Sequence, residues 1–286
     1  MDINTETIKL SETLTVPAIG YGCYNPRCDR NREIFRIAIE SGYRYFDTAY
    51  IYGTERELGA AIKDAGISRA ELTIATKAWH DQLGRELTKT ACYRSLENLQ
   101  LDYIDVYLIH WPRHNAECDW RAMDIEAWRA MCELKAEGVV REIGVSNFLP
   151  HHLQNLLDNS DVPPVLNQLE LHPGYCQESA VSYCEDKAIQ LQAWGPLGRG
   201  RMLTNEYISA LAAKYGKSPA QICIKFLLQR GIMPVVKSSS IERMKENRDV
   251  FDFELTEEEM WMIRCMPQDG WMGEHPDFKI PAKESK

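Results

Sequence analysis

The chain has 286 residues, of which 44% are hydrophobic and 26% are charged, and its formal net charge is −9. This composition is that of a globular protein and excludes an intrinsically disordered or collagen-like chain. An acidic chain without a basic block also argues against general binding to nucleic acids or to an anionic membrane surface.

Short apolar runs alternate with longer amphipathic patterns, as strands alternate with helices in α/β proteins. A β-hairpin from residues 8–10 and 14–16 is expected first, and eight strand–helix units follow it. The predicted strands are 18–21, 45–48, 72–76, 106–110, 143–146, 167–170, 191–194 and 233–236. The predicted helices are 30–41, 55–65, 87–99, 125–137, 151–158, 179–187, 206–215, 219–230, 241–250 and 257–265.

Several of these strands, such as 72–76, 106–110 and 233–236, are apolar along their whole length instead of alternating. Strands that helices cover on both faces of a parallel sheet have this pattern. We therefore predict an α/β fold, a (β/α)8 TIM barrel with an N-terminal β-hairpin and a C-terminal helix and tail. A doubly wound open sheet is the alternative. Because no linker-like segment divides the sequence, residues 1–286 are expected to form a single barrel domain.

The nine cysteines are scattered, and no two of them form a C-x-x-C pair. An odd number of cysteines in a chain of this length indicates reduced, buried thiols rather than a disulfide framework. The N-terminal residues do not resemble a secretory signal, and no apolar stretch reaches the roughly 18 residues that a membrane-spanning helix needs. A cytoplasmic protein is therefore expected.

Polar side chains follow three successive predicted strands. Asp47, Lys77 and His110 stand at the ends of these strands, and Tyr52 follows shortly after the first of them. Because TIM-barrel enzymes place their chemistry at the C-terminal ends of the strands, these four side chains are expected to converge at one mouth of the barrel.

Six segments around these positions resemble the aldo-keto reductases. They are GYRYFDTAYIYGTERELG, TIATKAW, DVYLIHWP, EIGVSNF, LNQLELHP and VVKSSSIERMKEN, in this order. The resemblance extends over about residues 8–254. It implies an NADPH-dependent enzyme on a TIM barrel that reduces an aldehyde or ketone to an alcohol by hydride transfer.

By this resemblance, Asp47, Tyr52, Lys77 and His110 form the family's catalytic tetrad. Negative charge grows on the carbonyl oxygen during reduction, so a proton donor at that oxygen has a large effect. Tyr52 is the expected general acid, although a free phenol has a pKa of about 10. The ammonium of Lys77 is expected to lower that pKa, and Asp47 is expected to keep Lys77 charged. His110 would donate a second hydrogen bond and orient the substrate.

The expected cofactor site contains no G-x-G-x-x-G motif after the first strand and no P-loop motif, which argues against Rossmann-type and P-loop binding. Ser238, Ser239 and Ser240 instead precede a predicted helix whose N-terminal amides attract phosphate. Lys237 and Arg243 add positive charge there. The resemblance implies that this segment holds the 2′-phosphate, which favours NADPH over NADH.

The resemblance implies the other cofactor contacts as well. Trp194 would stack on the nicotinamide, and the carboxamide would receive hydrogen bonds from Ser146, Asn147 and Gln168. The turn after Trp194 would let the backbone approach the pyrophosphate, and Glu246 and Asn247 would lie near the adenine. The remaining expected contacts are Gly22, Cys23, Tyr24, Asp47, Gly195, Pro196, Leu197 and Gly198.

Aromatic side chains are expected on the substrate side, where they suit apolar or planar carbonyl compounds. The predicted substrate contacts are Tyr24, Tyr52, Trp79, His110 and Trp111, with Trp271 as a further candidate.

Two other functions stay open from the sequence. The first is a non-catalytic, NADP-binding regulatory or auxiliary subunit on the same fold, which the complete tetrad argues against. The second is a barrel hydrolase with paired carboxylates or a metal ion, but the histidines lack the spacing of a metal site and no metal is predicted. The expected partner is a small carbonyl substrate, with no nucleic acid and no membrane, and the expected state is a monomer.

Overall fold

Eight parallel strands close into a barrel, as the alternation of strand and helix patterns predicts. The computed structural model describes residues 7–25, 28–112, 119–268, 270 and 275–277. Neighbouring strands pair in chain order and β10 closes onto β3, so the TIM barrel is confirmed and the open-sheet alternative is wrong. The strands are β3 (Gly20–Gly22), β4 (Tyr45–Asp47), β5 (Thr73–Ala78), β6 (Ile104–Ile109), β7 (Val140–Ser146), β8 (Leu166–Glu170), β9 (Gln190–Trp194) and β10 (Met233–Val236).

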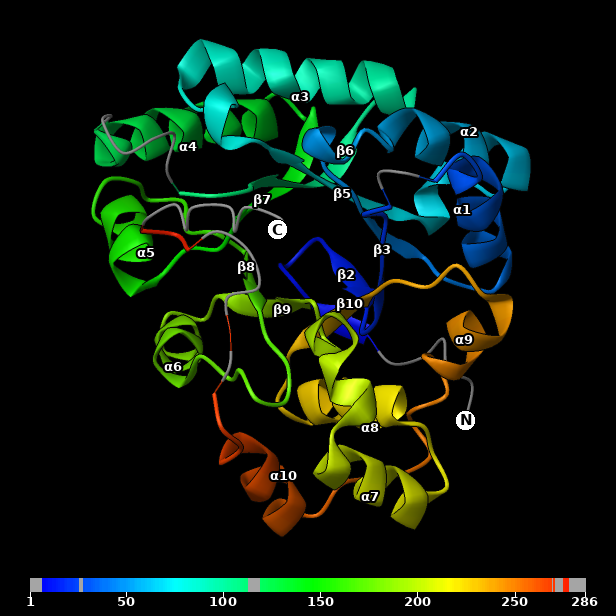
Figure 1. Ribbon diagram of the computed structural model, residues 1–286. Helices are drawn as coiled ribbons and strands as arrows, with labels where there is room; N and C mark the ends of the chain where they lie inside the picture. The colour runs from blue at the N-terminus through cyan, green and yellow to red at the C-terminus, as the bar shows by residue number, and fades with distance from the viewer. Residues whose placement is uncertain (1–6, 26–27, 113–118, 269, 271–274, 278–286) are drawn as a thin grey trace, which may run out of the picture.

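Helices surround the strands, and Figure 1 shows α1 to α8 as a ring around the barrel. Every residue of β5 and of β6 is buried, which explains why these segments are mostly apolar, with Lys77 and Asp105 as their charged members. The helices are α1 (Asn31–Glu40), α2 (Glu55–Ala65), α3 (Arg85–Leu99), α4 (Trp120–Ala136), α5 (Pro150–Leu157), α6 (Glu178–Asp186), α7 (Glu206–Tyr215), α8 (Pro219–Gln229), α9 (Ile241–Glu246) and α10 (Glu257–Arg264).

The predicted hairpin is confirmed as β1 (Thr7–Lys9) paired antiparallel with β2 (Thr15–Pro17). Its apolar side chains belong to the same buried cluster as the first residues of several barrel strands. This cluster includes Leu10, Leu14, Val16, Tyr45, Leu166 and Met233. The hairpin therefore closes the N-terminal end of the barrel and leaves the C-terminal end for a functional site.

Local capping and close packing account for where helices begin and how they approach each other. Helix α4 begins before the predicted residue 125, because the carboxylate of Asp119 accepts the backbone N–H groups of Arg121 and Ala122 at 3.2 and 3.4 Å. On α2, a Cβ at Gly59 would lie 2.2 Å from the carbonyl oxygen of Leu99. Only glycine permits this approach of α2 to the end of α3.

The described part of the chain contains four short 3₁₀ helices that were not predicted from the sequence. They are η1 (Tyr50–Tyr52), η2 (Arg69–Glu71), η3 (His80–Gln82) and η4 (Gly198–Thr204). The first of them carries Tyr52, and the last follows the turn after β9. Single turns of this kind are too short for a periodic pattern, so their positions had no sequence signal.

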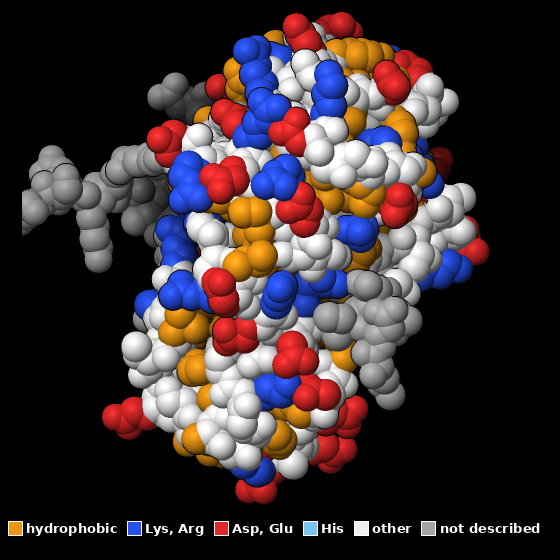
Figure 2. All heavy atoms as spheres, turned by 90° about the vertical axis from the view of Figure 1, so that its right-hand side faces the viewer, with side chains coloured by type: hydrophobic (Ala, Val, Ile, Leu, Met, Phe, Trp, Pro, Cys, Tyr) orange, Lys and Arg blue, Asp and Glu red, His pale blue; other side chains and the backbone are white. Residues whose placement is uncertain are grey.

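The surface that carries α1, α2 and α9 mixes both signs of charge (Figure 2). One pair on it joins two helices, since Arg32 of α1 contacts Asp64 of α2 at 2.6 Å. Among the helices that the structure describes, none has the length and apolar character needed to cross a bilayer.

Candidate active site

Four side chains predicted to act together meet at the C-terminal ends of adjacent strands. Asp47 is the last residue of β4, and Lys77 lies in the neighbouring β5. His110 follows β6 directly, and Tyr52 ends η1 after β4. Parallel pairing of β4, β5 and β6 brings these strand ends to the same edge, so residues far apart in the sequence share one site.

Lys77 and Asp47 form a buried ion pair, with side chains that are 0% and 5% exposed. Nζ of Lys77 donates to Oδ1 of Asp47 at 2.6 Å and to the carbonyl oxygen of Thr48 at 3.0 Å. Burial lowers the pKa of Lys77, while the charge of Asp47 opposes this shift. An ammonium has three donors, and the described residues give the third donor no partner. Nζ lies 5.3 Å from the ring centroid of Tyr52.

Tyr52 is partly exposed, and its hydroxyl lies 3.4 Å from Nε2 of His110. Burial around the hydroxyl raises the pKa of Tyr52 well above its ordinary value, and the charge of Asp47 raises it further. The expectation that Lys77 lowers this pKa is therefore wrong for the free enzyme. The physical reason is that burial disfavours the phenolate most strongly, and the negative charge of Asp47 adds to this effect. Tyr52 consequently stays protonated and can donate.

His110 is buried, and its pKa lies well below the ordinary value because of burial and the nearby charge of Lys77. The imidazole is therefore neutral near pH 7 and can donate a single hydrogen bond. Its Nδ1 is buried and has no hydrogen-bond partner among the described residues. The ring of Trp79 stands edge-on at a centroid distance of 4.8 Å.

Aromatic rings continue outward from this group. The ring of Tyr24 is 4.9 Å from that of Tyr52 between centroids, and Tyr24 is 59% exposed. Trp79 directly follows β5, and Trp111 directly follows His110. Both side chains are half-buried. Trp271 lies outside the described residues. The predicted substrate contacts that the structure describes therefore lie next to the tetrad or directly follow it in sequence.

The predicted nicotinamide contacts lie in the next three strands or directly after them, and they are hydrogen-bonded to one another. Asn147 has a left-handed backbone (φ +62°), and its Oδ1 accepts the indole N–H of Trp194 at 2.8 Å. Its Nδ2 donates to the carbonyl oxygen of His110 at 2.9 Å. The hydroxyl of Ser146 donates to the carbonyl oxygen of Gln168 at 2.9 Å. Gln168 Nε2 donates to Asp47 Oδ2 at 2.8 Å, so these residues are tied to the tetrad.

The predicted phosphate segment follows β10. Nζ of Lys237 donates to the hydroxyl of Ser239 at 3.0 Å, and Ser238 donates to the carbonyl oxygen of Ser240 at 3.2 Å. Lys237 and Arg243 are exposed, and within the described part of the chain neither has a carboxylate at ion-pair distance. Two unpaired cations beside hydroxyl groups fit an anionic phosphate group.

The other predicted cofactor residues lie on the same side of the barrel mouth. Gly22 ends β3 in register with Asp47, and the N–H of Cys23 donates to the carbonyl oxygen of Asp47 at 2.8 Å. Gly195 and Gly198 adopt left-handed φ values of +62° and +57° in the turn after β9. Pro196 and Leu197 lie in that turn, and Glu246 and Asn247 lie at the end of α9. In the barrel β10 lies between β9 and β3, so the loops that carry these residues are neighbours at the mouth.

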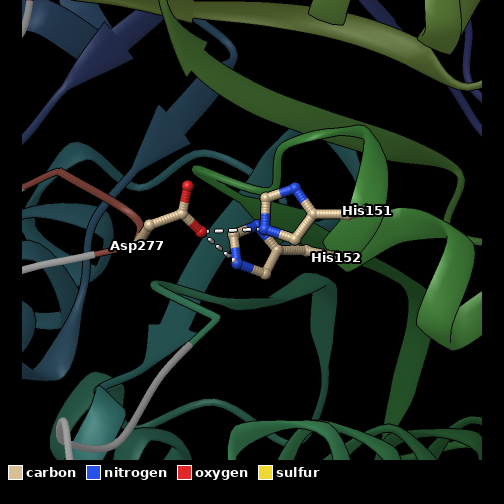
Figure 3. Close-up of side chains that lie close together, drawn as sticks. All are labelled: His151, His152 and Asp277. Atoms are coloured by element: carbon tan, nitrogen blue, oxygen red, sulfur yellow. Dashed lines mark hydrogen bonds and ion pairs between the residues drawn. The ribbon is translucent and has the colours of Figure 1, made fainter.

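A cluster of His151, His152 and Asp277 was not predicted from the sequence (Figure 3). Oδ1 of Asp277 lies 2.8 Å from Nε2 of His151 and 3.2 Å from Nε2 of His152. The two histidines begin α5, and Asp277 stands 126 positions after His151, so no local spacing signals the contact.

The hydrogen bonding of His152 argues against a metal at this cluster. A ligating histidine usually donates a hydrogen bond from its second ring nitrogen. Nδ1 of His152 instead accepts the N–H of Leu149 at 3.1 Å, so the proton of the neutral ring is on Nε2. Burial and the charge of His151 lower the pKa of His152 to about 3, which keeps the ring neutral. The cluster therefore fastens Asp277 to the start of α5 by hydrogen bonds.

Known proteins resemble this chain in sequence and in fold. The model of the Aldo/keto reductase family matches residues 24–266. Glyoxal reductase of Bacillus subtilis (strain 168) is 41% identical over 273 residues, which cover 95% of this chain and 96% of that protein. The 9,11-endoperoxide prostaglandin H2 reductase of Trypanosoma cruzi (strain CL Brener) is 40% identical over 288 residues, with 99% of each chain covered.

A solved structure carries the cofactor. The aldo-keto reductase of Bombyx mori in complex with NADP has a TM-score of 0.85 and 34% identity to this chain, and the match covers 92% of this chain and 94% of that one. The named relatives are reductases, which sets aside the auxiliary-subunit and hydrolase hypotheses. The chain therefore belongs to the aldo/keto reductase family and is an NADP-dependent oxidoreductase.

Proposed function

We propose that the enzyme reduces a small aldehyde or ketone to its alcohol with Tyr52 as the general acid. The observation that carries this proposal is the position of the Tyr52 hydroxyl, 3.4 Å from Nε2 of a neutral, buried His110. The buried ammonium of Lys77 lies 5.3 Å from the same ring and has a donor without a partner among the described residues. Two donors and one cation thus surround a point where negative charge develops on a carbonyl oxygen.

NADPH, when bound, supplies the hydride that attacks the carbonyl carbon. Tyr52 donates its proton to the oxygen, so the product leaves as a neutral alcohol and a phenolate stays behind. The free donor of Lys77 stabilises that phenolate, and Asp47 holds Lys77 in place. The neutral His110 gives the oxygen its second hydrogen bond and thereby fixes the direction of the C=O group.

The residues around the mouth would hold the two ends of the cofactor separately. At one end, Trp194 would stack on the nicotinamide, because Asn147 fixes its indole by a hydrogen bond at 2.8 Å. Ser146 and Gln168 would bond the carboxamide. The remaining residues of the proposed cofactor site are Gly22, Cys23, Tyr24, Asp47, Gly195, Pro196, Leu197, Gly198, Lys237, Ser238, Ser239, Ser240, Arg243, Glu246 and Asn247.

The substrate is proposed to be a small carbonyl compound of the kind that glyoxal reductase takes. The ring of Tyr24 lies 4.9 Å from that of Tyr52, and the ring of Trp79 lies 4.8 Å from that of His110, between centroids. Rings of this kind accept uncharged carbonyl compounds without a specific charge partner. The other relative named above acts on a much larger molecule, so glyoxal, methylglyoxal and a bulky ketone should be compared by kcat/KM.

The test of the acid is Tyr52→Phe, which removes one oxygen atom. We expect kcat to fall by roughly 10²–10⁴-fold, the usual effect of losing a positioned general acid. The dissociation constant of NADPH, measured by isothermal titration calorimetry, should stay within about twofold, because the ring itself remains. Turnover that persists in the pure variant at the wild-type rate would refute the assignment.

The preference for NADPH is tested by Arg243→Gln and Lys237→Gln. Each change removes one cation from the proposed 2′-phosphate site, so the affinity for NADPH should fall by roughly tenfold, as expected for a lost charge-assisted hydrogen bond. The affinity for NADH should hardly change, because NADH lacks that phosphate. Equal losses for both dinucleotides would place the 2′-phosphate elsewhere.

We further propose that the enzyme is a monomer in the cytoplasm. The eight cysteines that the structure describes are all free thiols, which suits a reducing compartment. Light scattering of the purified protein at micromolar concentration tests the monomer directly.

A further inference from the structure

A glutamate and a histidine lie buried beneath the turn that follows β9, and neither has a part in the reaction as described above. Glu170 is the last residue of β8 and is in register with Trp194 of β9. His172 follows two positions later. Both side chains are 0% exposed, and Nε2 of His172 lies 3.2 Å from Oε1 of Glu170.

The hydrogen bonds of this pair require one shared proton. Nδ1 of His172 lies 2.7 Å from the carbonyl oxygen of Pro173, which can only accept, so Nδ1 carries a hydrogen. Nε2 therefore either donates to a carboxylate as part of an imidazolium or accepts from a protonated Glu170. In both cases the pair is neutral overall and has a proton between Nε2 and Oε1. Loss of Glu170 would leave Nε2 of His172 buried without its hydrogen bond.

The pair also connects two loops at the mouth of the barrel. In the loop after β8, the carbonyl oxygen of Glu170 accepts Nε2 of Gln177 at 2.8 Å, and His172 exchanges two backbone hydrogen bonds with Tyr175 at 3.1 and 2.8 Å. In the turn after β9, the ring of His172 packs against Gly198. A Cβ at Gly198 would lie 3.4 Å from Nδ1 and 3.5 Å from Cε1 of His172.

We propose that Glu170 and His172 are positioning residues, which set the turn from Trp194 to Gly198 in the conformation that binds the cofactor. The inference rests on the proposed cofactor contacts of that turn. Register pairing fixes Trp194 beside Glu170, and ring packing fixes Gly198 beside His172, so both ends of the turn depend on this one buried pair. Neither residue touches the reacting atoms, so their effect should appear in binding and not in the chemical step.

The experiment measures the dissociation constant of NADPH by calorimetry, and kcat at saturating NADPH, in Glu170→Ala and His172→Gln. We expect the dissociation constant to rise by roughly tenfold or more in both variants, as for the loss of a buried hydrogen bond. In the same variants, kcat should stay within about threefold, because the tetrad is intact. Glu170→Gln should recover most of the affinity, since its amide can donate to Nε2 of a neutral His172.

Asp105→Asn is the matched control, because Asp105 is also a buried carboxylate but lies near the start of β6, at the other end of the barrel. It should lower the thermal midpoint without raising the dissociation constant of NADPH. An unchanged dissociation constant in Glu170→Ala and His172→Gln would overturn the proposal, as would an equal rise in Asp105→Asn. Should Glu170→Ala not fold, His172→Gln and Glu170→Gln decide the question. Binding is measured without turnover, so a failure of the Tyr52 assignment would not affect this result.

Discussion

The two ends of the barrel hold buried charges in opposite ways. At the N-terminal end, Asp105 accepts the backbone N–H of Ile74 at 2.9 Å and contacts Arg69 and Arg141 at 2.6 and 3.1 Å. Both arginines reach solvent, with side chains 20% and 44% exposed. Each oxygen of this carboxylate therefore has a partner, and the cations that balance it remain hydrated.

At the C-terminal end, the cation itself is buried, and its hydrogen-bond donors are not all used. Lys77 is 0% exposed, and only two of its three donors have partners among the described residues. Nδ1 of His110 is also buried, and it has no hydrogen-bond partner among the described residues. A carboxylate with partners on both oxygens, such as Asp105, stabilises the fold, whereas the ammonium of Lys77 has a remaining donor that can serve a ligand or an anion formed beside it.

Lys77→Met should have the largest effect, on both activity and stability. Without the ammonium the phenolate of Tyr52 loses its partner, and we expect kcat to fall by roughly 10²–10⁴-fold. Asp47 would stay buried without its cation, so the free energy of unfolding should fall by about 3–5 kcal/mol. Chemical denaturation and steady-state kinetics measure the two effects.

The double variant Asp47→Asn/Lys77→Met separates these two effects. It removes the uncompensated charge, so much of the free energy of unfolding should return, while kcat should stay low. If the double variant regained activity together with stability, Lys77 would act only through the fold.

Asp105→Asn should give the converse result at the N-terminal end. Removal of the negative charge leaves Arg69 and Arg141 with weaker partners, and we expect the free energy of unfolding to fall by about 2–4 kcal/mol. Because no part of the proposed site lies at this end, kcat and KM should be unchanged within error. A large fall in kcat at a temperature where the variant is folded would contradict the division of the barrel into two functions.

The sequence was sufficient for the barrel, and it placed the residues of the proposed site at the ends of the strands. Pairing between the strands brings their ends together, and Asp47, Lys77 and His110 stand at three of those ends. The pKa of Tyr52 was wrongly predicted, since it depends on how Asp47 balances Lys77 and on how far the hydroxyl is desolvated. Neither quantity can be obtained from the order of residues.

Contacts between distant segments had no sequence signal either. Asp277 lies 126 positions after His151 in the sequence, and only the path of the folded chain brings it to His151 and His152. Glu170 and His172 are close in sequence, but their importance depends on the turn at Gly198, which packs on the ring from another strand end. Packing partners of this kind can be identified only in the folded structure.

Glu259 on α10 is a charged side chain on the outside of the barrel (Figure 1). We expect its substitution to have the smallest effect of those considered. Burial opposes its ionisation, but hydrogen bonds from Lys214 and Tyr215, at 2.6 and 2.5 Å, lower the pKa of Glu259 to about 2. Its pKa in the unfolded chain is higher, about 4.3. The carboxylate therefore contributes stability that is complete above about pH 5 and is lost as the pH falls toward 2.

Glu259→Gln should lower the free energy of unfolding by about 1–2 kcal/mol at pH 7, where the carboxylate of the wild type is fully ionised. The difference between the two proteins should shrink as the pH falls from 5 toward 3, because the wild-type carboxylate then takes up a proton on unfolding. Thermal midpoints of both proteins at pH 7, 5, 4 and 3 measure this directly. A difference that stays constant over this range would mean that Glu259 stabilises α10 through the geometry of its cap with Thr256, which glutamine only partly reproduces, and not through its charge.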